Sequence, residues 1–274
     1  MKHLLAACLL PVLTGPLAWS QNIGALLPKQ LRGVGIEQHL NAQMPLDAEF
    51  TDEAGRHVRL RDYTGSRPVI LALVYYQCTM LCNQTLNGIA TGLRPLSLRP
   101  GKDFAVLAIS INPRETPTLA YAKKLRYGHS SFNAAESSGW HFLTGTEPNI
   151  HAVAETAGFR YRYDPKTDTF LHGSGILILT PEGKVARYLF GVDFKPKDLK
   201  LGLLEASRGR IGSAADQVLV FCYRYDPTTG TYSVAVLNLL RLSAAATILI
   251  AAVTLGIFWR EDIRTGPKVT GKVR

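Results

Sequence analysis

The chain has 274 residues, of which 46% are hydrophobic and 19% are charged. This composition is sufficient for one full-sized domain plus membrane-directed segments, and it excludes a disordered or fibrous protein. The formal net charge is +10. The basic residues are scattered, however, and form neither a Lys/Arg-rich block nor an alternation with aromatic residues, so the sequence does not predict nucleic-acid binding.

Residues 1–20 have the three parts of a secretory signal peptide. A basic start precedes an apolar run over 4–13, and Ala18-Trp19-Ser20 supplies small residues at the −3 and −1 positions of a cleavage site. The apolar run is short for a membrane span. A lipid attached at Cys8 is the alternative, although only seven residues precede it. We interpret residues 21–46 as a lead-in segment of mixed composition.

Residues 47–208 predict one α/β domain. The run 69–76 is apolar throughout and rich in β-branched and aromatic residues, which is typical of a strand buried on both faces. Strands of this kind alternate with helical patterns, and right-handed crossovers then make neighbouring strands parallel. A turn signal at 181–184 adds an antiparallel hairpin. We therefore predict a central mixed sheet flanked by helices. In chain order, the predicted elements are a hairpin over 50–62, a strand over 69–76, a helix ending near Leu93, a strand over 104–111, a helix from Pro117 to about Tyr127 capped by Thr116, a strand over 140–144, a helix over 149–158, strands over 176–180 and 185–190, and a helix over 197–208.

A similar ten-residue pattern occurs in two distant parts of the chain. The segment 161–170 reads YRYDPKTDTF, and the segment 223–232 reads YRYDPTTGTY. Asp-Pro favours a tight turn, so each copy predicts a β-hairpin. The second copy lies in residues 209–236, next to the membrane segment predicted below, and we expect a juxtamembrane β-hairpin there.

Residues 237–259 predict one transmembrane helix. The segment is long and apolar enough to cross a hydrocarbon core of about 30 Å. Five basic residues follow in the tail 260–274, so the positive-inside rule places the C-terminus in the cytoplasm. We expect a single-pass protein of the inner (cytoplasmic) membrane, with its domain in the periplasm or outside the cell.

Cys78 and Cys82 are the residues that point most directly to chemistry. They are spaced i, i+4 where a buried strand meets a helix, and in a helix this spacing brings two side chains onto one face, in range for a disulfide or a shared ion. The first turn of a helix also favours the thiolate. Removal of the signal leaves three cysteines, an odd number that excludes a fully paired disulfide scaffold within one chain. We expect Cys222 to be a buried packing residue.

His172 is the best candidate for a third ligand among the seven histidines. It stands in the glycine-flanked loop 170–175, which in the predicted topology passes close to the junction that carries the cysteines. Two thiolates suit Cu(I), and an imidazole also accommodates Cu(II). Zinc is the competing ion, although a structural zinc site usually has a fourth protein ligand and none is evident. A simple disulfide and buried structural thiols also remain open. Ordinary core, surface or satisfied polar roles are expected for Met80, His129, His141 and His151.

Four segments, in this order, resemble landmarks of the SCO/SenC family, and they span about residues 46–207. The resemblance includes a bacterial branch with a C-terminal membrane helix. It implies a thioredoxin-like fold, copper bound by Cys78, Cys82 and His172, and a chaperone role in assembly of the CuA centre of cytochrome c oxidase. The implied partner is subunit II of the oxidase or another copper-transfer protein. Family members often have Pro where Thr79 stands and Asp where Asn112 stands. The four segments are 75–82 (YYQCTMLC), 110–117 (SINPRETP), 140–145 (WHFLTG) and the His172 loop.

Two activities other than metal delivery remain open. In a thiol–disulfide oxidoreductase, Cys78 and Cys82 would cycle between dithiol and disulfide and would reduce the cysteines of the oxidase copper site. The Cys-x-x-x-Cys spacing and His172 favour metal binding over this reading. A peroxidase of the peroxiredoxin type would place Thr three positions before the reactive cysteine, where this chain has Tyr75.

Overall fold

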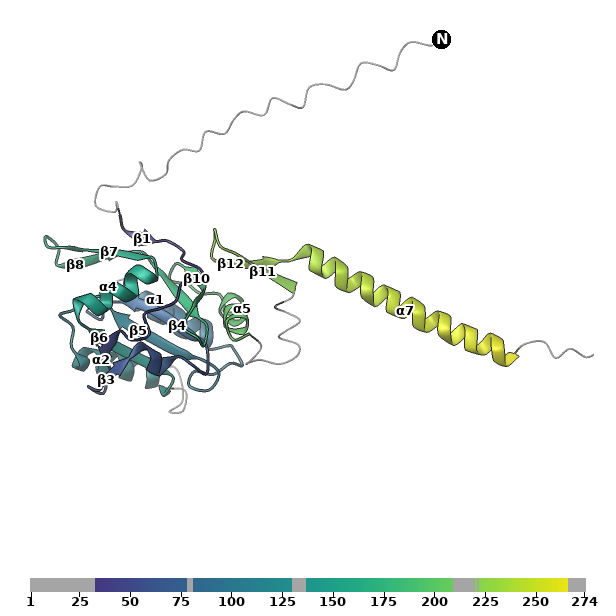
Figure 1. Ribbon diagram of the computed structural model, residues 1–274, viewed down its shortest axis with the longest axis horizontal. Coiled ribbons are helices and arrows are strands. Elements are labelled where there is room, and N and C mark those ends of the chain that lie inside the picture. The colour runs from purple at the N-terminus through teal and green to yellow at the C-terminus, as the bar shows by residue number, and fades with distance from the viewer. Residues whose placement is uncertain (1–32, 78–80, 130–136, 209–219, 221, 266–274) are drawn as a thin grey trace, which may run out of the picture. The chain divides into compact units, whose positions relative to one another are not determined.

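The computed structural model describes residues 33–77, 81–129, 137–208, 220 and 222–265. Among these residues, a central sheet has the strand order β10-β9-β4-β5-β6-β2-β3, a smaller sheet has the order β1-β7-β8, and β11 pairs with β12 (Figure 1). This architecture confirms the predicted mixed α/β fold. The elements are β1 (Gly35–Ile36), β2 (Glu49–Thr51), β3 (His57–Arg59), a 3-10 turn (Leu60–Tyr63), β4 (Val69–Val74), α1 (Leu81–Leu93), β5 (Ala105–Ser110), α2 (Pro117–Lys124), a π-helical turn (Leu125–His129), β6 (Trp140–Gly145), α4 (Glu147–Thr156), β7 (Phe159–Asp164), β8 (Thr169–His172), β9 (Gly175–Leu179), β10 (Val185–Phe190), α5 (Pro196–Ala206), β11 (Tyr223–Asp226), β12 (Thr231–Val234) and α7 (Val236–Thr265).

The centre of the large sheet is parallel and its flanks are antiparallel. β4 pairs with β5 and β5 with β6 in parallel, as expected for strands joined by helical crossovers. β9 runs antiparallel to β4 and forms a hairpin with β10, as the turn signal at 181–184 predicts. On the other flank, β2 pairs antiparallel with β6 and with β3.

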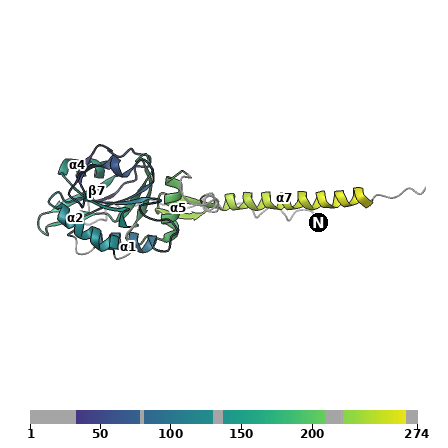
Figure 2. The ribbon, with the colours of Figure 1, turned by 90° about the horizontal axis from the view of Figure 1, so that it is seen from below.

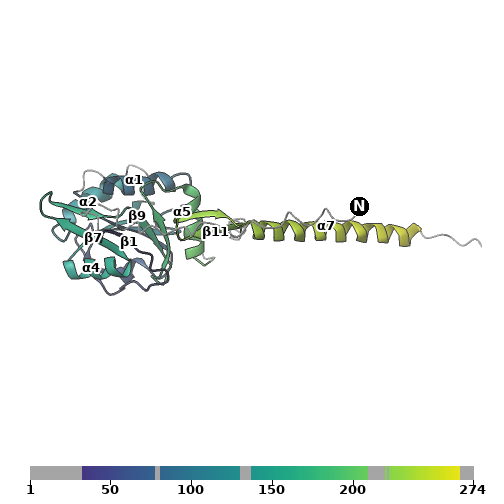
Figure 3. The same ribbon diagram turned by 90° about the horizontal axis from the view of Figure 1, so that it is seen from above.

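Strand β4 divides its side chains between two apolar cores. All six of its residues are buried, which explains the continuous apolar run in the sequence. The even-numbered residues 70–74 pack in the core formed with α1, α2 and α5, and the odd-numbered residues 69–73 pack in the core formed with α4. Figures 2 and 3 show α1 and α2 on one face of the sheet and α4 on the other.

Two glycines let α1 lie close to the chain that follows β10. A Cβ atom added at Gly88 would lie 1.8 Å from the carbonyl oxygen of Val192, and one added at Gly92 would lie 2.4 Å from that of Phe194. Both neighbours are backbone atoms, so no side-chain rotation could relieve the overlap. Helix α1, which includes the backbone of Cys82, is therefore fixed against residues 192–194 by direct backbone approach.

Both copies of the ten-residue pattern form hairpins. In each, the turn aspartate accepts the backbone N–H two residues later, at 3.0 Å between Lys166 and Asp164 and at 2.9 Å between Thr228 and Asp226. This is the local bond expected of aspartate in a turn. The first hairpin, β7–β8, pairs through β7 with β1, so residues 35–36 of the lead-in form part of this small sheet.

The second hairpin packs against α5 and the edge strand β10. The hydroxyl of Tyr225 accepts the backbone N–H of Tyr188 at 3.1 Å and donates to the carbonyl oxygen of the same residue at 2.7 Å. Tyr232 is almost fully buried, and its backbone N–H donates to Asp198 on α5 at 3.1 Å. Tyr225 thus satisfies main-chain groups at the outer edge of β10, the same edge at which the main chain of Asn41 and Ala42 binds Val185.

Helix α7 contains one segment that is long and apolar enough to cross a membrane. This segment runs from residue 238 to residue 260 with a mean hydropathy of 2.1, and it is the one candidate of its kind among the described residues. Only Ala235 separates the helix from β12. The predicted signal (1–20) and most of the predicted tail (260–274) lie outside the described residues.

Two local predictions differ from the structure. Thr116 does stand at the N-cap of α2 and is followed by Pro117, but its side chain makes no capping hydrogen bond, and its carbonyl oxygen instead accepts N–H groups of the first turn. The predicted helix to about Tyr127 ends as an α-helix at Lys124 and continues as a π-helical turn. A period-3.6 pattern in the sequence cannot distinguish these two kinds of turn.

Candidate metal centre

The chain that leads to the cysteines is held by a buried carboxylate. After β4 ends, the backbone N–H groups of Tyr76 and Gln77 donate to the two carboxylate oxygens of Glu115, each at 2.7 Å. Helix α1 begins at Leu81, so the backbone of Cys82 lies in its first turn. Cys78, Thr79 and Met80 and the side chain of Cys82 lie outside what the structure describes.

His172 ends β8, and its ring lies between two aromatic side chains. The centroid of the imidazole is 6.2 Å from that of Tyr75, edge to face, and 5.7 Å from that of Phe159. Its Nδ1 atom lies 2.8 Å from the carbonyl oxygen of Gly173. A carbonyl can only accept, so Nδ1 carries the proton and Nε2 carries the lone pair. Metal-bound histidines show this arrangement, in which one nitrogen is fixed by a hydrogen bond and the other coordinates.

Burial keeps the His172 imidazole neutral. The loss of solvent lowers the pKa of this histidine below its ordinary value of 6.5, against a smaller upward effect of the hydrogen bond to Gly173. Metal ions bind the neutral form, so at neutral pH no proton has to be displaced from Nε2.

The structure brings His172 next to the strand end that precedes the cysteines. Tyr75, which contacts the imidazole, stands three residues before Cys78 in the sequence. Within the described part of the chain, no group of three His, Cys, Asp or Glu side chains could hold a metal ion. The three predicted ligands therefore remain a prediction, with one of them in a suitable setting.

Comparison with known proteins decides the family. The SCO1/SenC family model matches residues 38–200, more than half of the chain. The chain belongs to the SCO1/SenC family. No curated protein matches the sequence.

Solved structures agree with the fold of this SCO1/SenC protein. A protein of Aquifex aeolicus VF5 named for electron transfer is 23% identical with a TM-score of 0.55, over 62% of this chain and 95% of its own. A SCO1/SenC family lipoprotein of Bacillus anthracis is 18% identical with a TM-score of 0.50, over 63% and 98%. A copper-bound ScoI of Arabidopsis thaliana is 19% identical with a TM-score of 0.47, over 58% and 95%. The first two confirm the predicted thioredoxin-like fold.

Sequence reasoning missed the role of Glu115 in this SCO1/SenC protein. The side chain is buried, and besides the two amides it accepts the hydroxyl of Ser110 at 2.5 Å. Three donors offset the loss of solvent around this buried carboxylate. The available signal was that Glu115 lies in the segment 110–117, one of the four family landmarks. No local pattern connects this residue with amides 38 and 39 positions earlier.

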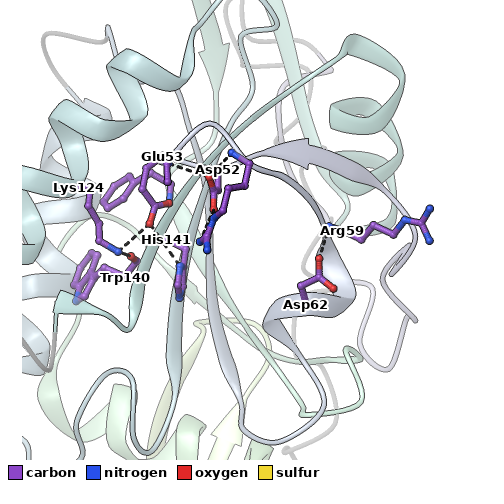
Figure 4. Close-up of polar contacts among 10 residues, drawn as sticks. Asp52, Glu53, Arg59, Asp62, Lys124, Trp140 and His141 are labelled. Carbon is purple, nitrogen blue, oxygen red and sulfur yellow. Dashed lines mark hydrogen bonds and ion pairs between the residues drawn. The ribbon is translucent and has the colours of Figure 1, made fainter.

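Of the three histidines for which ordinary roles are expected, His141 and His151 have side chains that the structure describes. His141 is largely buried, and its Nδ1 atom lies 3.7 Å from the carboxylate of Glu53. Figure 4 shows this contact beside Lys124 and Trp140. His151 is exposed and lies 3.6 Å from Glu155. His151 fits the expected surface role, whereas Nδ1 of His141 is buried without a hydrogen-bond partner among the described residues, so the satisfied polar role expected for His141 is not confirmed. The side chain of His129 is outside the described residues.

The expectation for Cys222 is wrong. Its thiol is free and only partly buried, and the residue stands just before β11. The apolar neighbours 218–221 suggested a buried strand, but the strand begins one residue later, at Tyr223, where the aromatic residues of the hairpin supply the buried surface.

Proposed function

We propose that this SCO1/SenC protein is a copper metallochaperone for assembly of the CuA centre of cytochrome c oxidase, with Cys78, Cys82 and His172 as ligands. Copper is the cargo of the protein. The observation that carries the proposal is the setting of His172, with Nδ1 committed to Gly173 and the ring against Tyr75. Family membership supports it, as does the Cys-x-x-x-Cys spacing of Cys78 and Cys82 in the sequence.

The donor set matches the chemistry of copper handling. Two thiolates hold Cu(I) because both partners are soft, and an imidazole accepts either oxidation state. The backbone of Cys82 lies in the first turn of α1, and unpaired N–H groups in the first turn of a helix favour the thiolate form of a cysteine. The proposed recipient is the copper domain of oxidase subunit II or another copper-transfer protein.

A second candidate function uses the same cysteines without the histidine. In a thiol–disulfide exchange, the two thiols of Cys78 and Cys82 would become a disulfide while a disulfide in the oxidase copper site becomes two thiols, with two electrons and two protons transferred. The position of Cys82 in the first turn of a helix favours this reading as well.

The proposal includes a single-pass arrangement in the inner membrane. Residues 238–260 would span it, the domain would face the periplasm or the cell exterior, and the tail would lie in the cytoplasm. In this arrangement the domain lies on the side of the membrane where disulfides form.

The test is copper titration of the full-length protein in detergent, with Cys78→Ser, Cys82→Ser and His172→Ala beside wild type. We expect a stoichiometry near one copper per chain and weaker binding in each variant. Unchanged binding in all three variants would refute the ligand set. In cells, His172→Ala separates the two functions: oxidase assembly that survives it but is lost in Cys78→Ser would support thiol–disulfide exchange.

A further inference from the structure

The loop between β5 and α2 contacts both chain segments of the proposed copper site. We define residues 112–115 as the bracket loop. We propose that the bracket loop fixes the spacing between the cysteine segment and His172, with Arg114 as the positioning residue on the histidine side. This inference rests on the proposed function, since it concerns the arrangement of the same site.

On the cysteine side, the contact is made by Glu115. Its carboxylate binds the backbone N–H groups of Tyr76 and Gln77, the last two residues described before Cys78. These are charge-assisted bonds to a buried acceptor, and they leave the chain that approaches the cysteines little freedom to move.

On the histidine side, the contact is made by Arg114. Its Nη2 atom donates to Asp168 at 2.9 Å, and its guanidinium lies 5.0 Å from the ring centroid of Tyr163. The Tyr163 hydroxyl donates to the same aspartate oxygen at 2.7 Å. The hydrogen bonds from Tyr163 and Arg114, with the arginine charge, lower the pKa of Asp168. Tyr163 and Asp168 both belong to the hairpin that ends at His172.

The two ends of this contact are themselves fixed. The side-chain oxygen of Asn112 accepts the backbone N–H of Arg114 at 3.0 Å and its Nε at 3.4 Å, which directs the arginine toward the hairpin. Asp168 has a φ of +50°, the left-handed conformation that aspartate tolerates in turns. Strand β8 starts at the next residue and runs directly to His172.

Because these side chains are exposed, a positioning role for Arg114 can be distinguished from a role in folding. Both side chains of the Arg114–Asp168 pair are more than half exposed, and an exposed pair contributes little to the free energy of unfolding. Loss of Arg114 should therefore leave overall stability nearly unchanged while it frees the hairpin. A residue important only for folding would show the opposite pattern.

The experiment compares Arg114→Gln, Asp168→Asn and Arg114→Lys in the full-length protein in detergent. The control is Arg59→Gln, which removes an exposed pair of the same kind, with Glu49 at 3.2 Å, on β3. Cu(I) affinity is measured by competition with a chromophoric chelator, and the thiolate-to-copper absorption of the Cu(II) form is recorded. Amide hydrogen exchange of residues 159–172 is measured without copper.

We expect Arg114→Gln and Asp168→Asn to weaken copper binding by about 3- to 10-fold, below the ~10- to 100-fold typical of partners that touch a ligand directly. Their Cu(II) absorption should shift, and hairpin exchange should accelerate. Because both variants lose the Arg114–Asp168 pair, the double variant should weaken binding by less than the product of the two single effects. Arg114→Lys should fall between wild type and Arg114→Gln, since it keeps the charge but not the planar fork.

Two results are decisive. If amide hydrogen exchange of residues 159–172 is the same in Arg114→Gln and Arg59→Gln, the proposal that the bracket loop fixes the hairpin is overturned, whatever the copper measurements give. An unaltered affinity and spectrum in Arg114→Gln, in a protein that binds copper, would also overturn it. Wild-type protein that binds no copper would instead overturn the proposed function, and the exchange data alone would then decide whether Arg114 fixes the hairpin.

Discussion

Tyr232 on β12 donates its hydroxyl hydrogen to a carboxylate oxygen of Glu205 on α5 at 2.6 Å. Arg187 on β10 binds the same oxygen at 2.7 Å, so one carboxylate joins three elements that are distant in sequence. The hairpin before α7 is thus specifically bound to the domain.

Tyr232→Phe should lower the free energy of unfolding by about 1–2 kcal/mol. The residue is buried, and the lost bond has an ionised acceptor, the stronger class of hydrogen bond, while Arg187 still pairs with Glu205. Urea unfolding of the full-length protein would measure the loss. Tyr121→Phe, at an exposed position on α2, is the control and should have no effect. Equal stabilities of the two variants would contradict the docking.

Gly88→Ala should destabilise the protein, although alanine is the better helix former. Helix propensity favours the change by up to about 1 kcal/mol, but the new Cβ would lie 1.8 Å from the Val192 carbonyl oxygen, and forced overpacking costs about 1–3 kcal/mol or more. We expect the cost of this steric overlap to exceed the gain in helix propensity. Gly256→Ala in α7 is the control, because nothing lies within 4 Å of its Cβ position. Thermal unfolding would compare them, and a more stable Gly88→Ala protein would refute the close approach of α1.

Glu53 should make the protein sensitive to acid. Burial by itself would raise the pKa of this carboxyl, but the nearby His141 ring, hydrogen bonds from the Phe142 N–H and Lys124, and the lysine charge lower it from 4.5 to about 2 (Figure 4). A lowered carboxyl pKa stabilises the fold above the unfolded-state value, and this stabilisation is lost as pH falls from about 4.5 toward 2. The shift corresponds to about 3 kcal/mol.

Unfolding free energies of wild type and Glu53→Gln between pH 2 and 7 would check this dependence. We expect the largest difference between the two proteins above pH 4.5 and a small one near pH 2, because the native carboxyl is then protonated. Glu49→Gln removes an exposed carboxylate on the adjacent strand and is the control. A difference that did not shrink in acid would show that Glu53 does not hold its charge in the fold.

The direction of the membrane helix can be read from fusions at the C-terminus. We expect green fluorescent protein fused after Arg274 to fluoresce and alkaline phosphatase fused there to be inactive, since the basic tail should stay in the cytoplasm. Replacing the five basic residues of the tail by glutamine should raise phosphatase activity. An active phosphatase fusion on the native tail would reverse the proposed orientation.

The sequence predicted the framework of the fold because that framework depends on local patterns. The continuous apolar runs of β4 and β5, the turn at 181–184 and the two Asp-Pro turns are each written within a few residues, and the structure confirms the elements that they predict. Family landmarks add the thioredoxin-like arrangement, which the comparisons confirm.

The contacts that surround the candidate site could not be predicted in the same way. Arg114 and Asp168 are 54 positions apart, and Tyr76 and Glu115 are 39 apart, so no local pattern relates them. Cys222 was misjudged because apolar neighbours suggest burial but do not fix which residue faces the core. The copper ligands stay a prediction, of which the structure describes the side chain of His172 alone.

The hydroxyl of Tyr225 hydrogen-bonds the backbone N–H and C=O groups of Tyr188 on β10, an edge strand of the large sheet. Without this hairpin, the N–H and C=O groups of Tyr188 would be unpaired at the border of the sheet, beyond the part of β10 at Val185 that the main chain of Asn41 and Ala42 covers. An open sheet edge is the usual template for association between identical chains. A soluble fragment that stops at residue 208 would expose that border. We therefore expect such a fragment to dimerise or aggregate through this edge of the sheet. Studies of oxidase assembly that use the fragment would then use a protein whose oligomeric state has been altered by the truncation.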